Sequence, residues 1–106
     1  MDDKQYRKAV DECFSRVAKR LEDFDPDEAD YSTMDGAVTI EFSDGDKFIL
    51  SRQSAAHQIW LAAGAHGYRY SWDEGRNVWI DDKEGHELYA RLAQLVAEKV
   101  SHSVVF

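Results

Sequence analysis

Apolar residues recur every three or four positions in the first part of the chain, with charged residues between them. The residues that follow this spacing are Tyr6, Val10, Phe14, Val17 and Leu21. Such a period places one apolar stripe along an α-helix. We therefore predict an amphipathic helix from Asp3 to about Asp23. Pro26 ends it, because proline lacks a backbone donor and disfavours helical geometry at Asp25.

The middle of the chain alternates apolar and polar residues, which is the period of a strand with one buried face. The predicted strands are Ala37–Phe42, Lys47–Arg52, Gln58–Ala62, Tyr68–Trp72 and Val78–Ile80. The turn residues Ser43-Asp44-Gly45-Asp46 join the first two strands, so we predict a hairpin there. We expect an antiparallel sheet of at least five strands, preceded by a turn-like linker that continues to Gly36.

The same alternation assigns side chains to the two faces of the predicted sheet. In the first strand Val38, Ile40 and Phe42 share one face, which we expect to be covered. Glu41 falls on the opposite face, where it should point to water near the other acidic residues.

Trp60 is the candidate contact residue of the predicted sheet. Its neighbours Ile59 and Leu61 point to the other face, so Trp60 is exposed if they face the core. An exposed aromatic residue on a polar sheet face is typical of a partner-binding site. The alternative is a packed tryptophan that is covered by Arg52 or Tyr70.

A second helical period follows the strands and predicts a helix from about Gly85 to Val100. Its apolar residues are Leu88, Leu92, Leu95, Val96 and Val100. A short apolar tail, Ser101–Phe106, completes the chain. The order helix, sheet, helix predicts an α+β fold with both helices on the same face of the sheet. We expect residues 1–106 to form a single domain.

Composition indicates the cellular compartment of the protein and excludes some classes of partner. Cys13 is the only cysteine, so no internal disulfide is possible, and we expect a half-buried structural thiol in a reducing compartment. We see neither a signal peptide nor an apolar run of about 20 residues, and so expect a cytoplasmic protein with no membrane partner. A pI near 4.8 argues against a nucleic-acid partner.

The negative charge is concentrated between Glu22 and Asp46. This stretch holds ten acids and no Lys or Arg, whereas outside it 11 acids face 13 bases, so the net charge of −8 is local. The ten acids are Glu22, Asp23, Asp25, Asp27, Glu28, Asp30, Asp35, Glu41, Asp44 and Asp46. Such a stretch is suited to weak binding of hard metal ions or to a basic protein, and the alternative is a solvated face.

The sequence contains no motif for catalysis, phosphate binding or calcium binding. The four histidines are scattered, without the spacing of a metal site or a nucleophile and base pair, and we expect them to be exposed and chemically idle. The glycines match no phosphate-binding pattern, and the segment from Asp25 fails as a calcium loop at Ala29, Asp30 and Gly36. We therefore expect no enzyme with its own pocket.

Four segments together resemble the frataxin family, specifically the bacterial frataxins of the CyaY type. The segments are Arg52-Gln53, His57-Gln58-Ile59-Trp60-Leu61-Ala62, Gly67-Tyr68-Arg69-Tyr70 and Trp79-Ile80-Asp81. The resemblance covers essentially the whole chain. It implies a two-layer α-β sandwich, in which two roughly parallel helices pack on one face of an antiparallel sheet.

The resemblance also implies a function: frataxins bind iron weakly through an acidic ridge and act in iron–sulfur cluster assembly, where the bacterial form modulates a cysteine desulfurase. The ridge residues that match are Asp3, Asp11, Glu22, Asp23, Asp25, Asp27 and Asp30, to which the strand position adds Glu41. Ala18 and Lys19 depart from the acidic pattern of the family, and Arg7 stands where relatives can carry a metal-binding histidine. These departures favour residues 22–30 as the metal and desulfurase contacts, chiefly Glu22, Asp23, Asp25 and Asp27.

The sheet residues have a second implied partner. Trp60, with Gln58 beside it in the same motif, matches the family's sheet tryptophan, which is associated with the iron–sulfur scaffold protein. We expect a monomer, with iron-induced oligomers as an open alternative. Two rival functions also stay open: a metal-independent acidic interaction module, and, less favoured, a ferroxidase-type enzyme.

Overall fold

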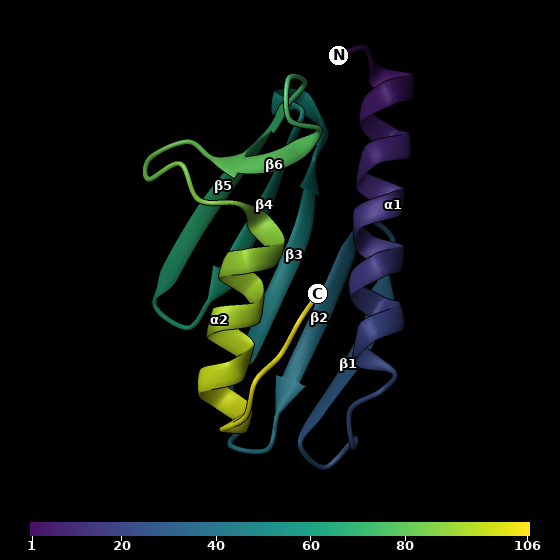
Figure 1. Ribbon diagram of the computed structural model, residues 1–106. Coiled ribbons are helices and arrows are strands. Elements are labelled where there is room, and N and C mark those ends of the chain that lie inside the picture. The colour runs from purple at the N-terminus through teal and green to yellow at the C-terminus, as the bar shows by residue number, and fades with distance from the viewer.

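The computed structural model describes residues 1–106 as two helices on one face of a six-stranded antiparallel sheet (Figure 1). The strands lie in sequence order from β1 to β6, and each pairs antiparallel with the next. This arrangement confirms the predicted α+β sandwich. The elements are α1 (Asp3–Leu21), β1 (Ala29–Met34), β2 (Ala37–Phe42), β3 (Lys47–Gln53), a short 3-10 helix (Ser54–Ala56), β4 (Gln58–Ala63), β5 (His66–Asp73), β6 (Val78–Asp81) and α2 (Leu88–Val100).

Strand β1 corrects the prediction of a turn-like linker up to Gly36. It is an edge strand, and four of its six residues are exposed, which hides the alternation. Its partner is β2, with Met34 opposite Ala37. The two residues between them are Asp35 and Gly36, and Gly36 has a φ of +78°. An Asp-Gly pair of this kind is a strong signal for a tight hairpin, so the sequence contains the evidence for β1.

Both helices are shorter than predicted. Helix α1 begins at Asp3 as expected, with Asp2 and Gln5 forming a capping box, but it ends at Leu21 and not near Asp23. Helix α2 begins at Leu88 and not at Gly85. Gly85 has a φ of +74°, which is not helical, and the Glu87 side chain caps the helix by accepting hydrogen bonds from two backbone amides.

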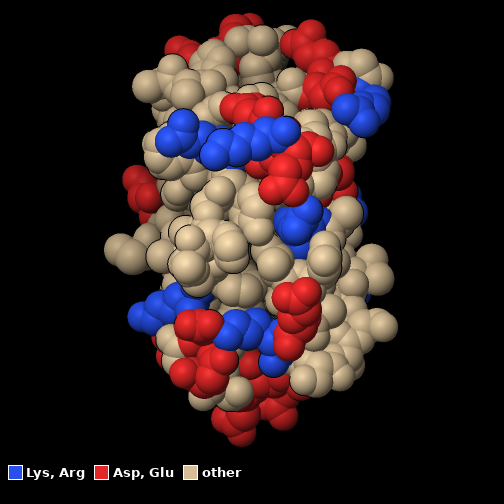
Figure 2. Space-filling view, turned by 90° about the vertical axis from the view of Figure 1, so that its left-hand side faces the viewer, with Lys and Arg blue, Asp and Glu red and all other residues tan.

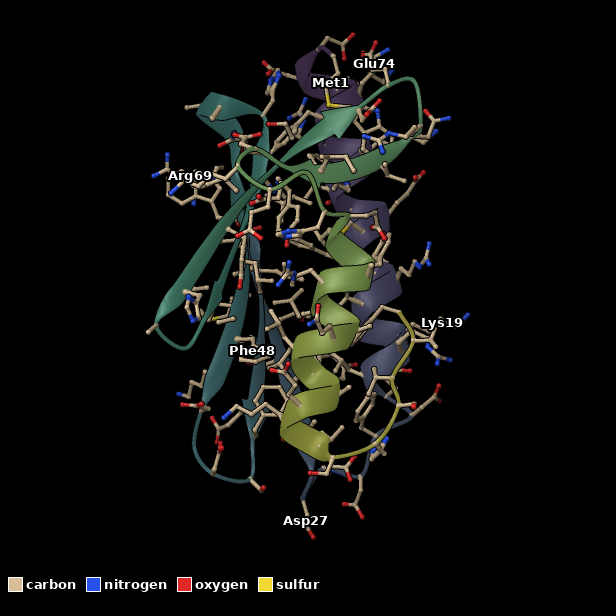
Figure 3. The ribbon with its side chains drawn as sticks, turned by 60° about the vertical axis from the view of Figure 1, so that its left-hand side comes forward. Met1, Lys19, Asp27, Phe48, Arg69 and Glu74 are labelled. Atoms are coloured by element: carbon tan, nitrogen blue, oxygen red, sulfur yellow. The ribbon has the colours of Figure 1, made fainter.

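The core lies between the helices and the inner face of the sheet. The predicted inward residues Val38, Ile40 and Phe42 are buried, as are most residues of the apolar stripes of both helices. Phe48 on β3 points from the sheet toward α2 (Figure 3) and packs edge-on against Phe42 at 4.7 Å between ring centres. Neither helix combines the length and apolar character needed to cross a membrane.

The C-terminal tail joins the two helices. After α2 the chain turns back and runs between α2 and α1 (Figure 1), and the Phe106 side chain is buried. Two arginines of α1 hold its backbone: Arg16 donates to the Phe106 carbonyl at 2.8 Å and Arg20 to the Val105 carbonyl at 2.9 Å. The tail therefore fixes the C-terminal end of α1, where most acids of the Glu22–Asp46 stretch lie.

Candidate functional site

The acidic residues gather where α1 ends and β1 begins. This end of the molecule lies opposite Met1 and Glu74, with Asp27 projecting from it (Figure 3). Asp and Glu side chains are also grouped at this end in the space-filling view (Figure 2). The chain reverses here because Leu21 and Ala29 are both buried, which anchors the two sides of an exposed turn.

The turn itself is ordered by Asp25. Its carbonyl accepts from the amides of Glu28 and Ala29 at 2.9 and 3.0 Å, and its carboxylate Oδ1 accepts from the amide of Asp27 at 2.9 Å. These bonds form a single helical turn that leads directly into β1. The carboxylates of the turn are thus carried on a fixed backbone and not on a loose loop.

Five of the ten acids of the stretch are paired with bases, most of which come from elsewhere in the chain. The pairs are Asp23 with Arg20 at 3.5 Å, Glu28 with His102 at 2.7 Å, Glu41 with Lys47 at 3.5 Å, Asp44 with Lys99 at 2.7 Å, and Asp46 with Lys99. The hydrogen bonds from Lys99 lower the pKa of Asp44, and those that Lys99 makes to both carboxylates raise its own pKa. The region is therefore less negative than the sequence suggests.

The other five acids have no basic partner within 4 Å. Glu22, Asp25 and Asp27 lie before and within the turn, Asp30 follows on the outer face of the sheet, and these four form what we call the free acidic group. Asp35 is separate, at the far end of β1, about 17 Å along the strand from Asp30. The free acidic group coincides with the part of the sequence, residues 22–30, that the family pattern favours.

A tyrosine belongs to this group and is not evident from the sequence. The Tyr31 hydroxyl donates to Oε1 of Glu22 at 3.0 Å, joining the end of α1 to β1. This hydrogen bond to a carboxylate raises the pKa of Tyr31. Only the position of Tyr31, two residues after the buried Ala29, hints that its side chain lies on the helix side of the edge strand.

Asp3 and Asp11 are not brought to the free acidic group. From Glu22, Asp11 is about 16 Å along α1 and Asp3 about 28 Å, at 1.5 Å per residue. Each also has its own partner: Asp3 Oδ1 lies 2.7 Å from His57, and Asp11 Oδ1 accepts from Arg52 at 3.3 Å. The hydrogen bond with His57 lowers the pKa of Asp3.

Glu41 points to water, as predicted, and lies on the outer face of the sheet. Across the β1–β2 pair it stands opposite Asp30, and it also pairs with Lys47 on β3. Glu41 therefore adjoins the free acidic group through Asp30 but is partly neutralised.

The free acidic group has the chemistry of hard oxygen ligands but not the geometry of a closed metal site. No three His, Cys, Asp or Glu side chains converge in the arrangement that would hold a metal ion. Exposed carboxylates supply one or two hard oxygen ligands each, and water completes the coordination of the ion. The free acidic group therefore offers exposed oxygen donors on an open surface.

Two expectations about reactive side chains are wrong. The histidines are not all exposed: His57 stacks on Tyr6 with 4.9 Å between ring centres, and the His86 side chain is mostly buried, with Nε2 3.0 Å from the Tyr70 hydroxyl. Cys13 is fully buried, not half-buried, and burial raises its pKa to about 12. Their partners lie on other elements, so spacing along the chain does not reveal them.

Trp60 lies on the outer face of the sheet but is half-buried, which corrects the prediction that it is exposed. Its cover is neither Arg52 nor Tyr70: the Arg69 guanidinium lies 4.7 Å from the centre of the Trp60 ring. Trp60 on β4 lies opposite Arg69 on β5. The two-residue turn Gly64-Ala65 fixes this register, because it places Ala63 opposite His66. That turn is the signal in the sequence that identifies Arg69 as the neighbour.

Comparison with known proteins identifies the family and the fold. A family model described as a frataxin-like domain matches residues 1–102. The frataxin of Psychromonas ingrahamii, used as a model of stability modulation within the CyaY protein family, is 28% identical with a TM-score of 0.88, over 99% of this chain and 97% of that chain.

Two structures of the trimeric frataxin of Saccharomyces cerevisiae share the fold. The form with the full-length N-terminus is 23% identical with a TM-score of 0.76, over 88% of this chain and 79% of that chain. The form complexed with ferrous iron is 21% identical with a TM-score of 0.64, over 93% and 85% of the two chains. From the match to the family model over nearly its whole length, the chain belongs to the frataxin family.

Proposed function

We propose that this protein binds iron weakly at the free acidic group and uses the same surface to modulate a cysteine desulfurase in iron–sulfur cluster assembly. The observation that carries the proposal is that the acids of the Glu22–Asp46 stretch differ in their pairing. Five of them pair with a Lys, Arg or His of the same chain, whereas Glu22, Asp25, Asp27 and Asp30 have no base within 4 Å. Uncompensated charge on a fixed turn is available to an external cation.

Iron acts in this proposal as cargo or signal and not as a resident cofactor. Support comes from membership of the frataxin family and from the yeast relative complexed with ferrous iron. Carboxylate oxygens are suitable ligands for iron, and their exposure means that water competes for each coordination position. We expect weak, exchangeable binding.

The desulfurase is proposed to contact the same carboxylates through a basic surface. Charges on exposed groups increase the rate of association and lose strength on screening by salt. Iron and desulfurase should therefore compete, and binding of the desulfurase should weaken as salt is raised to about 0.5 M. An affinity that does not change with salt would contradict this contact.

A pair of matched variants tests the proposal. Asp25→Asn with Asp27→Asn removes two free charges, whereas Asp44→Asn with Asp46→Asn removes two charges that share the single positive charge of Lys99. With a chelator present, we expect the first variant to bind the desulfurase about 3- to 10-fold more weakly and the second less than about 2-fold more weakly. Equal losses would show that only net charge matters and would overturn the assignment.

Two measurements separate the alternative functions. If the protein is a metal-independent interaction module, the affinity for the desulfurase is the same with Fe(II) as with chelator. A ferroxidase would consume oxygen through many turnovers with Fe(II), and we expect no such sustained consumption in an oxygen-electrode measurement.

The outer sheet face is proposed as the second contact, through Gln58 and Trp60, with the iron–sulfur scaffold protein.

The yeast relative is trimeric; for this chain we propose a monomer without iron, and light scattering with and without Fe(II) would reveal iron-induced oligomers. The cytoplasm is the proposed setting, supported by a single unpaired cysteine, Cys13.

A further inference from the structure

A chain of hydrogen bonds on the outer face of the sheet connects Asp82, just after β6, to Trp60 on β4. Asp82 Oδ2 accepts from Gln58 Nε2 at 2.6 Å, and Asp82 Oδ1 accepts from Ser71 Oγ at 2.8 Å. Gln58 Oε1 in turn accepts from Trp60 Nε1 at 2.9 Å. Asp82 and Trp60 are thus linked by one side-chain amide.

The chemistry of the two ends allows only one orientation of that amide. A carboxylate only accepts hydrogen bonds and an indole N–H only donates, so the NH₂ of Gln58 must face Asp82 and its oxygen must face Trp60. Ser71 agrees with this orientation, because its hydroxyl donates to Asp82 and accepts from Gln58 Nε2 at 3.2 Å. Without Asp82, the Gln58 amide loses the acceptor that fixes its NH₂ group on that side.

Asp82 is also tied to the residue that covers the ring of Trp60. Its amide donates to the Arg69 carbonyl at 2.9 Å, and the Arg69 side chain projects from the sheet face away from α2 (Figure 3). Trp60 is therefore held at its edge by Gln58 and on its face by Arg69. Beside it lies a groove of about 510 Å³, whose lining includes Ile49, Trp60, Arg69 and Asp82.

We infer that Asp82 is a positioning residue for Trp60: it fixes the Gln58 amide, and through it holds the indole in one orientation for a protein that docks on the sheet. This inference rests on the proposed contact of Trp60 with the scaffold protein. An aromatic anchor that is ordered before binding loses less side-chain entropy in the complex, so fixing Trp60 increases affinity. Asp82 itself does not have to touch the partner.

The orientation of Trp60 can be measured without any partner. The chain has three tryptophans, so the labelled protein gives three indole N–H signals, and Trp60→Phe identifies the one from Trp60. In Asp82→Ala we expect the Trp60 signal to shift and to exchange faster with water, while the other two stay in place. Glu98→Ala, which removes an exposed acid of α2, should change none of them. An unchanged Trp60 signal in Asp82→Ala would overturn the inference.

Titration with the scaffold protein tests the consequence. We expect Asp82→Ala to weaken binding about 3- to 10-fold and Glu98→Ala less than about 2-fold, with no further loss when Asp82→Ala is added to Trp60→Ala. An additional loss in that double variant would mean that Asp82 touches the partner, contrary to a positioning role. Wild-type affinity of Asp82→Ala, with Trp60→Ala weakened, would also overturn the inference.

Two controls keep the outcomes distinct. If Trp60→Ala binds the scaffold as well as the wild type, the proposed scaffold contact is wrong, and the indole signal alone decides whether Asp82 positions Trp60. If Asp82→Ala lowers the melting temperature, Asp82→Leu takes its place, because leucine keeps about the size of the side chain but offers Gln58 no acceptor.

Discussion

The ring Nε2 of His102, in the tail after α2, lies 2.7 Å from Oε1 of Glu28, in the turn before β1. This contact joins the C-terminal tail to the acidic turn. The hydrogen bond to Glu28 raises the pKa of His102 above its usual 6.5. Among the bases that pair with the acidic stretch, His102 is the one that titrates near neutral pH, because the others are lysine and arginine.

The stability that this pair contributes should depend on pH. Because the pKa of His102 is higher in the folded state, the contribution is fully present below pH 6.5 and is lost as pH rises through the folded pKa. We expect the melting temperature of Glu28→Gln to differ from that of the wild type more at about pH 6 than at about pH 8.5. NMR titration should give His102 a higher pKa in the wild type than in Glu28→Gln. A difference in melting temperature that is the same at both pH values would contradict a stabilising role of the charged His102.

Lys99 should determine which carboxylates can accept a metal ion. Its ammonium group binds both Asp44 and Asp46 and so occupies the position of a shared cation. In Lys99→Met we expect Fe(II) to broaden amide signals of the 43–46 turn, which stay sharp in the wild type. Signals of residues 22–30 serve as the internal control and should broaden in both proteins. Broadening of the 43–46 turn in the wild type would show that Lys99 does not exclude the metal.

The tail should contribute to stability mainly through one side chain. Phe106 is 6% exposed whereas its neighbour Val105 is 68% exposed. We expect Phe106→Ala to lower the free energy of unfolding by about 2–3 kcal/mol, and Val105→Ala by less than about 0.5 kcal/mol. The arginine bonds to the tail are to backbone carbonyls and are kept in both variants. Equal effects in a urea titration would mean that the Phe106 side chain is not packed in solution.

Cys13 should be unreactive in the folded protein. Burial raises its pKa to about 12, so almost none of it is thiolate near neutral pH. We expect alkylation by iodoacetamide to be at least about 1,000-fold slower in the native protein than in urea, where the thiol has its ordinary pKa. Rapid native alkylation would show that the helix around Cys13 opens readily.

The main architecture can be predicted from the sequence because it depends on local periodicity. The apolar stripes of α1 and α2 and the alternation in β2 follow from residue order alone, and the buried residues agree with them. The edge strand β1 escapes this kind of prediction because most of its side chains are exposed, and an edge strand needs no clear alternation. Its Asp35-Gly36 turn is the better signal.

The site can be predicted only in part because charge compensation is long-range. The sequence shows an acidic stretch without bases, but Lys99 is 53 positions from Asp46 and His102 is 74 from Glu28. Only the folded chain separates paired carboxylates from free ones. The same reason applies to Trp60, whose cover by Arg69 depends on strand register and whose link to Asp82 depends on the end of β6.

The central claim is that external cations bind at the free acidic group. The most direct test is an anaerobic titration of the isotope-labelled protein with Fe(II), followed through backbone amide signals, on the wild type and on Asp25→Asn with Asp27→Asn. We predict selective loss of signals from residues 22–30 and near Glu41 in the wild type, and little loss in the variant. Loss centred instead on Asp3 or on Asp44, or no selective change at millimolar iron, would contradict the claim.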